Sequence, residues 1–228
     1  MSAQDPIGSF DLVVNGLPQV ARFSPDDLEH LLVPLARRIA QAGPGPVLVA
    51  GAPGSGKSTV ALVLERLCAM LGRHVPALSM DGFHRPNSWL CAHGLLGRKG
   101  APETFDFDGL RHALVCPDPW PVYSRVAHDV AGETVRVRCS TFIVEGNYLL
   151  LDEEPWRQLA QLSPLTVWVD VDPQLLRERL VGRKVAGGMD RAAAERFFEE
   201  SDSLNVRRCL ERRLPAHVEL RLTPAEEL

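Results

Sequence analysis

The sequence contains little lysine, few aromatic residues and no paired cysteines. Lysine stands at only three positions (57, 99 and 184) among the 25 basic residues, so arginine carries nearly all the positive charge. We attribute this bias mainly to genome composition. The five cysteines are scattered, and none belongs to a C-x-x-C pair, which argues against a disulfide framework or a structural zinc site. A reducing cytosol is the simplest setting for such a chain.

Long apolar segments and a surplus of basic charge are also absent. No stretch approaches the ~18 apolar residues that a membrane-spanning helix requires. Residues 1–16 contain acids where a secretory signal would have a basic start and an apolar run. The formal net charge of −4 gives no broad basic surface for nucleic acid. We therefore expect a cytoplasmic protein without a membrane or nucleic-acid partner; a homodimer is one possible assembly.

Length and hydrophobic pattern indicate one α/β domain. A chain of 228 residues can bury one sizeable core but hardly two. Residues 1–24 are expected to be a loosely packed lead-in with a short strand at 10–14, and residues 25–228 the domain itself. Apolar strands separated by helices are typical of a parallel sheet, with ligands outside the carboxyl ends of its strands. The expected strands are 47–50, 75–80, 141–144, 165–169 and an edge strand at 218–222.

Helix and loop signals lie between these strands. Ser24 followed by Pro25 and two acids predicts a helix start, and further helices are expected at 58–71, from 173 and at 190–214. We expect the last of these to break near 201–203. Residues 82–109 are rich in Gly, Pro and His. This composition indicates a long functional loop with little regular structure. A small ribbon is expected at 134–138.

The segment after the first expected strand matches the pattern G-x-x-x-x-G-K-[ST], the P-loop. Its glycines let the chain curl so that backbone N–H groups point at phosphates. Lys57 then reaches the β- and γ-phosphates, and the Ser58 hydroxyl binds Mg²⁺. A chance glycine-rich turn is the alternative, but a strand runs into this loop and a helix leaves it. The expected nucleotide-binding residues are Gly51, Ala52, Pro53, Gly54, Ser55, Gly56, Lys57, Ser58 and Thr59.

Two carboxylates follow expected core strands. Asp81 ends the strand after the P-loop helix, where it could take the proton of an acceptor hydroxyl; a turn cap is the alternative. Glu145 follows the strand 141–144, where an acid can hold or orient Mg²⁺; a simple strand-end acid is the alternative. Asp170 ends a strand in the same way, and we interpret it as structural.

The signature of a GTPase is missing. None of the four asparagines is followed by lysine, so no N-K-x-D motif reads a guanine base. The run 106–109 matches D-x-x-G, but no strand precedes it, and we interpret the match as coincidence.

Several blocks carry a family resemblance: 79–84 (SMDGFH), 96–106 (LGRKGAPETFD), 121–124 (PVYS) and 144–151 (VEGNYLLL). In this order they resemble the uridine kinase, phosphoribulokinase and bacterial pantothenate kinase superfamily of P-loop kinases. The last block, with Trp156, most resembles the nucleoside-kinase-like or fructose-transport-system kinase subgroup. The resemblance covers residues 25–222. It implies a single P-loop kinase domain over 25–228, with a lid near 179–192.

The resemblance also implies roles for individual residues. Asp81 matches the catalytic base, Ser58 and Glu145 the magnesium-binding pair, and Lys57 the phosphate lysine. Glu103 matches an acid that contacts substrate hydroxyls, and Tyr123 a tyrosine of the substrate pocket. Arg179 and Arg183 match the arginines of a lid that closes over the phosphates, although a solvated helix face would explain them as well.

The acceptor stays open at this point. Pantothenate kinases carry His two residues after the matching tyrosine, where this chain has Arg125, and uridine kinases carry an F-D-H-P-type run where it has 100–103 (GAPE). Of the polar residues nearby, the candidates for the acceptor pocket are His84, Arg85, Arg125 and His128, with a polar loop role as the alternative.

The leading hypothesis is an ATP- and Mg²⁺-dependent kinase acting on a hydroxyl of a small metabolite: a sugar, a nucleoside or a pantoate-like acid. The main alternative is a nucleotide-binding regulatory P-loop protein with little transfer activity. Acids at the ends of two core strands favour catalysis, because a pure switch needs no acceptor base. A nucleic-acid-directed ATPase fits poorly with the acidic balance and the short chain.

Overall fold

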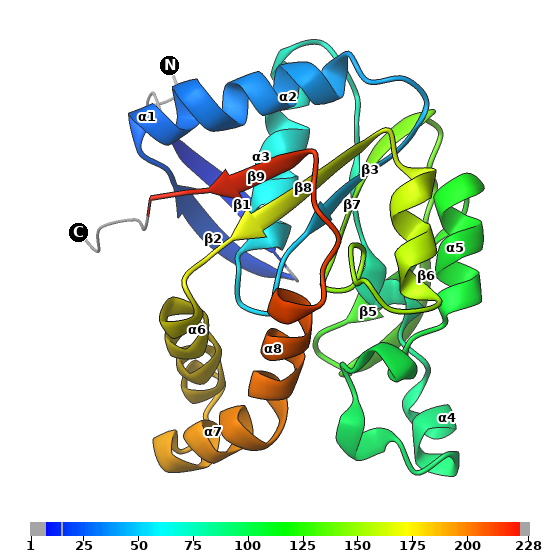
Figure 1. The fold of residues 1–228 in the computed structure, drawn as a ribbon, viewed down its shortest axis with the longest axis vertical. Helices are drawn as coiled ribbons and strands as arrows, with labels where there is room; N and C mark the ends of the chain where they lie inside the picture. Colours follow the sequence, from blue (N-terminus) through cyan, green and yellow to red (C-terminus); the bar gives the residue numbers. More distant parts are fainter. Residues whose placement is uncertain (1–7, 15, 224–228) are drawn as a thin grey trace.

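The computed structural model describes residues 8–14 and 16–223, and its centre is a five-stranded sheet (Figure 1). All the strand pairs in this sheet are parallel, so the predicted α/β architecture is confirmed. The strand that leads into the P-loop is the middle one, with two strands on each side of it. In order across the sheet the strands are β4 (Ala77–Ser79), β7 (Thr141–Gly146), β3 (Gly45–Ala50), β8 (Leu165–Asp170) and β9 (Val218–Arg221).

Side chains of β3 alternate between the two halves of the core. Val47 and Val49 belong to one apolar cluster and Leu48 and Ala50 to the other, as the two-residue period of a strand requires. Burial on both faces is the usual state of a parallel sheet. One face is covered by η1 (Leu28–Leu32), α2 (Val33–Ala40) and α3 (Lys57–Met70), the other by α5 (Phe107–Val115) and η5 (Trp156–Leu162).

The C-terminal helices extend from the carboxyl edge of the sheet, below it in Figure 1. They comprise α6 (Pro173–Ala186), α7 (Arg191–Phe197), the π-helical turn η6 (Phe198–Asp202) and α8 (Ser203–Glu211). The expected break near 201–203 is instead the turn η6, in which the chain stays helical but the hydrogen bonds span one more residue. The first helix of this group carries both predicted lid arginines, Arg179 and Arg183.

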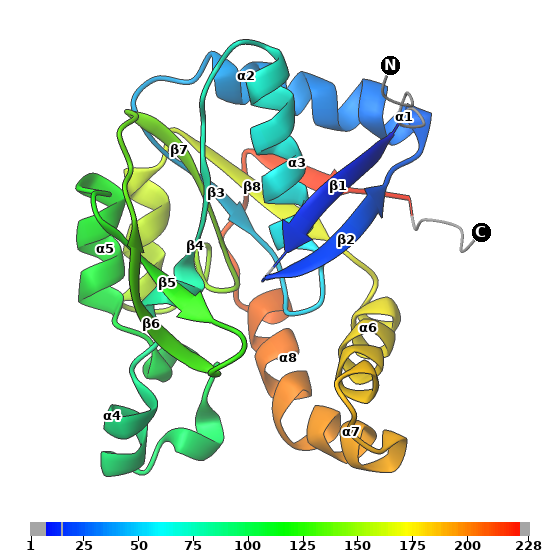
Figure 2. The same ribbon diagram turned by 180° about the vertical axis from the view of Figure 1, so that it is seen from behind.

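The N-terminal segment is better ordered than predicted. Instead of one short strand it forms an antiparallel hairpin of β1 (Ser9–Val14) and β2 (Leu17–Arg22), which lies beside α3 (Figure 2). Leu12, Val14 and Ala21 are buried in the cluster that includes α3, so the hairpin is part of the core. The Leu12–Val14 alternation was the signal for this packing. Residues 1–7, 15 and 224–228 lie outside the described residues.

The segment 82–109, expected to have little regular structure, contains several short helices. The turn η2 (Met80–Phe83) is followed by α4 (Asn87–Ala92), η3 (Leu96–Arg98) and η4 (Pro102–Thr104), and α5 begins at Phe107. Asp106 is the N-cap of α5 and accepts a hydrogen bond from the Gly109 N–H, 3.3 Å away, which explains the fortuitous D-x-x-G match. A ribbon is present but lies before the expected 134–138 and shares only residues 134–135 with it: β5 (Trp120–Ser124) pairs with β6 (Asp129–Val135).

Two composition-based expectations can be compared with the structure. Each of the five cysteines is a free thiol, in line with the absence of paired cysteines in the sequence. Over residues 8–14 and 16–223, no helix combines the length and the apolar character needed to cross a bilayer.

A buried carboxylate ties the two ends of the domain together. The first helical stretch begins at α1 (Pro25–Asp27), and the predicted cap Ser24 accepts a hydrogen bond from the Asp27 N–H at 3.0 Å. The Asp27 side chain is itself buried. It accepts hydrogen bonds from the N–H and the hydroxyl of Thr223, just after β9, at 2.9 and 3.3 Å. The helix start and the edge strand are therefore held by one charged group.

Asp27→Ala should lower the free energy of unfolding by about 1.5–3 kcal/mol, because two donors lose a charged, buried acceptor. Urea unfolding monitored by circular dichroism measures the change. The matched control is Asp26→Ala, whose side chain is 87% exposed and whose loss should stay within about 0.5 kcal/mol. Equal effects of the two substitutions would contradict a tying role for Asp27.

Candidate active site

The loop between β3 and α3 has the tight curl that its glycines permit. Gly54 and Gly56 have φ angles of 84° and 83°, a left-handed conformation that side chains rarely adopt. Gly51 is required for a different reason: a Cβ there would lie 2.6 Å from the Ser55 Oγ and 3.1 Å from the Val169 carbonyl oxygen. The loop therefore packs closely against β8, and glycine at positions 51, 54 and 56 keeps side chains out of its concave face.

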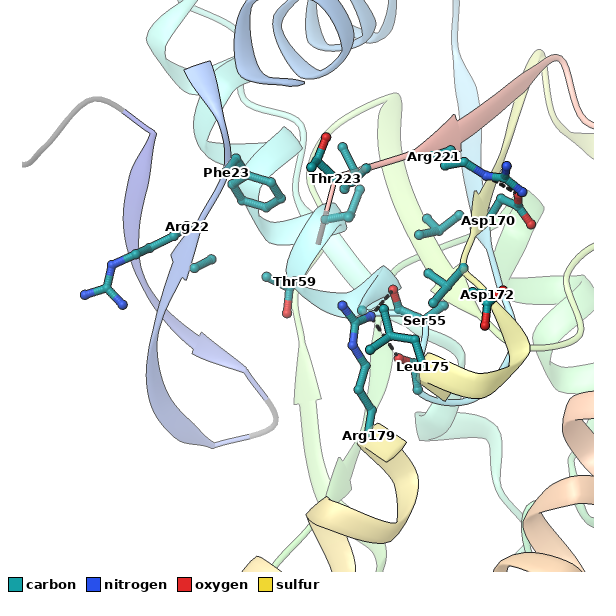
Figure 3. Close-up of a pocket in the computed structure, with 17 residues that line it drawn as sticks. Arg22, Phe23, Ser55, Thr59, Asp170, Asp172, Leu175, Arg179, Arg221 and Thr223 are labelled. Atoms are coloured by element: carbon teal, nitrogen blue, oxygen red, sulfur yellow. Dashed lines mark hydrogen bonds and ion pairs between the residues drawn. The ribbon is translucent and has the colours of Figure 1, made fainter. Parts of the chain in front are cut away.

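Polar groups in this loop are left for a ligand. The Ser55 Oγ is buried and has no hydrogen-bond partner among the described residues. Arg179, on α6, lies over the loop, and its Nη1 donates weakly to the carbonyl oxygens of Gly54 and Ser55 at 3.4 and 3.5 Å (Figure 3). A curled glycine loop at a helix N-terminus, with an unpaired hydroxyl and a nearby guanidinium, fits a phosphate group.

Glu145 lies at the end of β7, directly across the sheet from both β3 and β4. It pairs in register with Val49 on one side and Ser79 on the other, and its side chain is buried. Burial raises the pKa of Glu145. Lys57 and hydrogen bonds from the Ser79 and Ser58 hydroxyls lower this pKa, and the Asp81 charge raises it further. The predicted magnesium pair, Ser58 and Glu145, is therefore brought together beside Lys57, an oxygen-rich arrangement that suits Mg²⁺.

Asp81 stands in the turn η2 just after β4. The cap of that turn is Ser79, whose Oγ accepts from the Asp81 N–H at 3.2 Å, so the Asp81 carboxylate does not serve as the cap. Instead it is ion-paired with Arg125 from the β5–β6 ribbon. A cavity of about 140 Å³ is lined by Asp81, Tyr123 and Arg125 together with Ser79, Gly82 and Trp120. Three of the residues expected around the acceptor are thus gathered on one side of the site.

His84 and Tyr123 support the Asp81 turn. The His84 ring packs at a tilt against Phe105 and Tyr123, with centroids 3.9 and 4.9 Å apart, and its Nδ1 lies 2.9 Å from the Asp81 carbonyl oxygen. Burial lowers the pKa of His84, although the neighbouring Asp81 opposes the shift. The imidazole is therefore neutral at pH 7. Its packing between two rings makes it a support for the turn.

Glu103 does not line this cavity. Its carboxylate pairs with Arg98 and, at 3.3 Å, with Arg208 on α8, and Arg208 also binds Glu153 in a forked contact. The acid expected to contact a substrate hydroxyl is thus part of an ion network that joins the 96–104 segment to α8. The 96–104 segment is also held by Tyr148, which follows β7: its hydroxyl donates to the Gly100 carbonyl oxygen at 2.6 Å.

Both arginines expected in a lid lie on α6. One turn beyond Arg179, Arg183 is exposed and lies within electrostatic reach of Asp81 and Arg125. Its pKa is lowered, first by partial desolvation and then by the like charge of Arg125. The adjacent Lys184 points elsewhere, toward Asp202 at 3.3 Å and the ring of Phe197. Of these three α6 residues, Arg179 and Arg183 are therefore the ones that could contact bound phosphates, together with Lys57 of the P-loop.

A larger cavity of about 490 Å³ opens beside the P-loop, within the usual range for small-molecule sites. Phe23 and Thr223 lie on one side of it and Leu175 and Arg179 on the other (Figure 3). Apart from the P-loop residues and Arg179, the sequence did not point to this lining. No short motif marks the remaining residues, which come from the hairpin, the start of α6 and the end of β9. One indication of this cavity was present in the sequence: the strands predicted at 165–169 and 218–222 end at the same edge of the sheet as the strand before the P-loop. Asp170, interpreted as structural, pairs there with Arg221 at 2.9 Å.

A glycine loop between the central parallel strand and its helix, with acids at the ends of the next two strands, defines the P-loop nucleotide-binding fold. Comparison with known proteins places the chain further, although no family model matches it. The uncharacterized protein YggC of Escherichia coli is 40% identical over 213 residues, which are 88% of this chain and 90% of YggC. The crystal structure of a protein named as a fructose transport system kinase, from Silicibacter sp. TM1040, is 36% identical. It superposes with a TM-score of 0.76 over 82% of this chain and 98% of that one.

The chain is also 31% identical over 159 residues to the pantothenate kinase of Parvibaculum lavamentivorans, matching 59% of this chain and 46% of that enzyme. The chain therefore belongs to the uridine kinase, phosphoribulokinase and bacterial pantothenate kinase superfamily, and the resemblance of its motifs is confirmed. It spans about half the length of the pantothenate kinases it matches.

Glu145→Gln should make the free protein more stable at about pH 8, and the gain should shrink toward about pH 5. In the wild type the folded-state pKa of Glu145 is raised, so the unfolded chain loses this proton first as the pH rises. Stability then falls between the unfolded pKa of about 4.3 and the higher folded value. Glutamine keeps the shape and removes the buried charge.

Urea unfolding of both proteins at the two pH values measures this difference. Glu133→Gln, at an exposed position of β6, is the control and should leave the pH dependence of stability unchanged. A wild type that is more stable than Glu145→Gln at the higher pH would mean that the Lys57 and hydroxyl contacts outweigh the burial of the charge.

Proposed function

We propose that the protein is an ATP-dependent kinase that transfers the γ-phosphoryl group to a hydroxyl of a small metabolite. The observation that carries the proposal is the gathering of Lys57, Glu145 and Asp81 at one edge of the sheet, next to the P-loop. Membership of a superfamily that includes pantothenate kinases supports a small-molecule acceptor. The larger cavity, on the far side of the P-loop from Asp81, is the site we assign to the nucleoside part of ATP.

Each residue has a defined task in this proposal. Lys57 supplies a point charge to the transferring phosphoryl group, and Arg179 and Arg183 add charge from α6. Ser58 and Glu145 would hold Mg²⁺, which neutralises charge on the β- and γ-phosphates when bound. Asp81 accepts the proton of the acceptor hydroxyl as the new O–P bond forms and ADP departs. Catalysis then consists of positioning and charge neutralisation.

A screen of acceptors by coupled ADP release tests the proposal. Sugars, nucleosides and hydroxy acids, vitamin precursors included, are supplied with ATP and Mg²⁺, and ADP formation is compared with the rate without acceptor. At least one compound should raise the rate and be recovered as its phosphate ester. Tight ATP binding without any acceptor-dependent ADP would instead favour a nucleotide-binding regulatory protein.

Lys57→Ala should lower acceptor-dependent turnover by at least about 10²-fold, since it removes a fixed charge from the transferring group. The measurement is steady-state ADP release with the best acceptor from the screen. Arg66→Ala, at an exposed position of the same helix α3, should retain wild-type turnover. If Lys57→Ala kept it as well, the phosphates would not lie on this loop.

Asp81→Asn should reduce phosphoryl transfer by about 10²-fold or more while leaving ATP affinity nearly unchanged, because an amide of the same shape cannot take a proton. The test pairs calorimetric titration with ATP and turnover with the best acceptor. Asp108→Asn, at an exposed position of α5, serves as the control. Parallel losses of affinity and turnover would make Asp81 a residue of the nucleotide site, and no loss of either would refute its role as base.

A further inference from the structure

The carboxylate that we assign as the base is already paired. Arg125 contacts the Asp81 Oδ2, and within the described part of the chain Arg125 pairs with no other acid. The Asp81 side chain is 16% exposed and that of Arg125 38% exposed, so the contact is partly shielded from water. An acceptor hydroxyl that hydrogen-bonds to Asp81 therefore competes with a guanidinium for the same oxygens.

The surroundings offer Arg125 no substitute partner. Glu145 is engaged by Lys57 and the Ser58 and Ser79 hydroxyls, and His84 is neutral. Of the other nearby cations, Lys99 has its own partners in Asp129 and the carbonyl oxygen of His128, and Arg183 adds a second positive charge near Arg125. When Asp81 turns to a hydroxyl, Arg125 is left with an unmatched charge in a partly buried place, which is unfavourable.

Packing keeps Arg125 where a ligand would meet it. Its guanidinium lies 5.1 Å from the ring centroid of Tyr123, an interaction that orients the planar group. Both residues line the same cavity as Asp81, and its volume of about 140 Å³ is well below the ~300 Å³ at which ordinary small-molecule pockets begin. The space on this side of the site suits a molecule of a few carbon atoms better than a nucleoside.

We propose that the acceptor is a small anion, a hydroxyl compound whose carboxylate or phosphate group is bound by Arg125. This inference rests on the proposed kinase function and narrows its acceptor. The anionic group takes the forked donors of Arg125, and Asp81 is thereby released to accept the hydroxyl proton. A neutral sugar or nucleoside would leave the Arg125–Asp81 pair to be broken without replacement. Arg125 thus couples recognition of the acceptor's charge to exposure of the base.

Paired acceptors that differ in one charge test the proposal. Small hydroxy acids of three to five carbons are each compared with their carboxamides, and sugars with their monophosphates, in the ADP-release assay with saturating ATP. Wild-type protein should prefer the charged member of at least one pair by about 10²-fold in kcat/KM. The series that responds distinguishes a carboxylate from a phosphate as the recognised group.

Arg125→Gln should then lower kcat/KM for the charged acceptor by about 10²-fold, mainly through KM, and raise it for the neutral analogue, because Asp81 no longer has to be released from an ion pair, while the KM for ATP stays nearly unchanged. Arg125→Lys keeps the charge but not the fork and should fall between the two. The matched control is Arg136→Gln, because Arg136 is likewise ion-paired, with Asp118, but is 67% exposed and outside the cavity. It should behave as the wild type.

The outcomes separate this inference from the proposed function. Efficient phosphorylation of neutral acceptors, with equal effects of Arg125→Gln on both members of a pair, would leave the kinase standing and overturn the anionic acceptor. A rise in the KM for ATP alone would assign Arg125 to the nucleotide phosphates and also overturn it. If no compound in the panel were phosphorylated although ATP bound, the kinase proposal would fall, and this inference with it.

Discussion

The parallel register of β3, β7 and β4 is the constraint on which the rest of the site depends. Glu145 stands opposite Val49 on one neighbour and Ser79 on the other, so the chain leaves all three strands at one edge. The P-loop, the buried acid and the Asp81 turn must therefore meet there. A slip of one residue would reverse the alternation of Val47, Leu48 and Val49 between the two core clusters. The apolar core thus fixes the position of the charged residues.

Signals confined to a few residues were predictable from the sequence, and contacts between distant segments were not. The glycine spacing at 51–56 and the acids after two apolar runs could be read directly, because loop geometry and strand direction dictate where they lie. The partner of Glu103 could not, since Arg208 is more than a hundred residues away on α8. The strand predicted at 10–14 is β1, but its pairing with β2 was missed for a similar reason: Leu12, Val14 and Ala21 are buried against segments far along the chain, α3 among them.

The edge of the sheet carries groups that are unfavourable for stability alone. Glu145 is a carboxylate whose pKa is raised by burial, and the Ser55 hydroxyl is buried without a partner among the described residues. Each such group weakens the free protein. The buried apolar side chains of β3 and β8 and the helices over them offset this loss. Polar groups kept unsatisfied at the phosphate loop are what a binding site for a charged ligand requires, so the sites of local instability and of binding coincide.

The two sides of the site are built from different parts of the chain. This division determines what membership of the superfamily indicates about the acceptor. The phosphate side belongs to β3, α3 and α6, the elements around the central strand. The acceptor side belongs to the segment between β4 and β7, which supplies no further strand to the central sheet. Its short helices and β5–β6 ribbon carry exposed loop positions between buried residues such as Phe83, Leu90 and Trp120, and those exposed positions can change without disturbing the core. Membership of the superfamily therefore establishes the fold and the phosphate loop, whereas the acceptor that we propose depends on residues of that segment such as Arg125 and Tyr123.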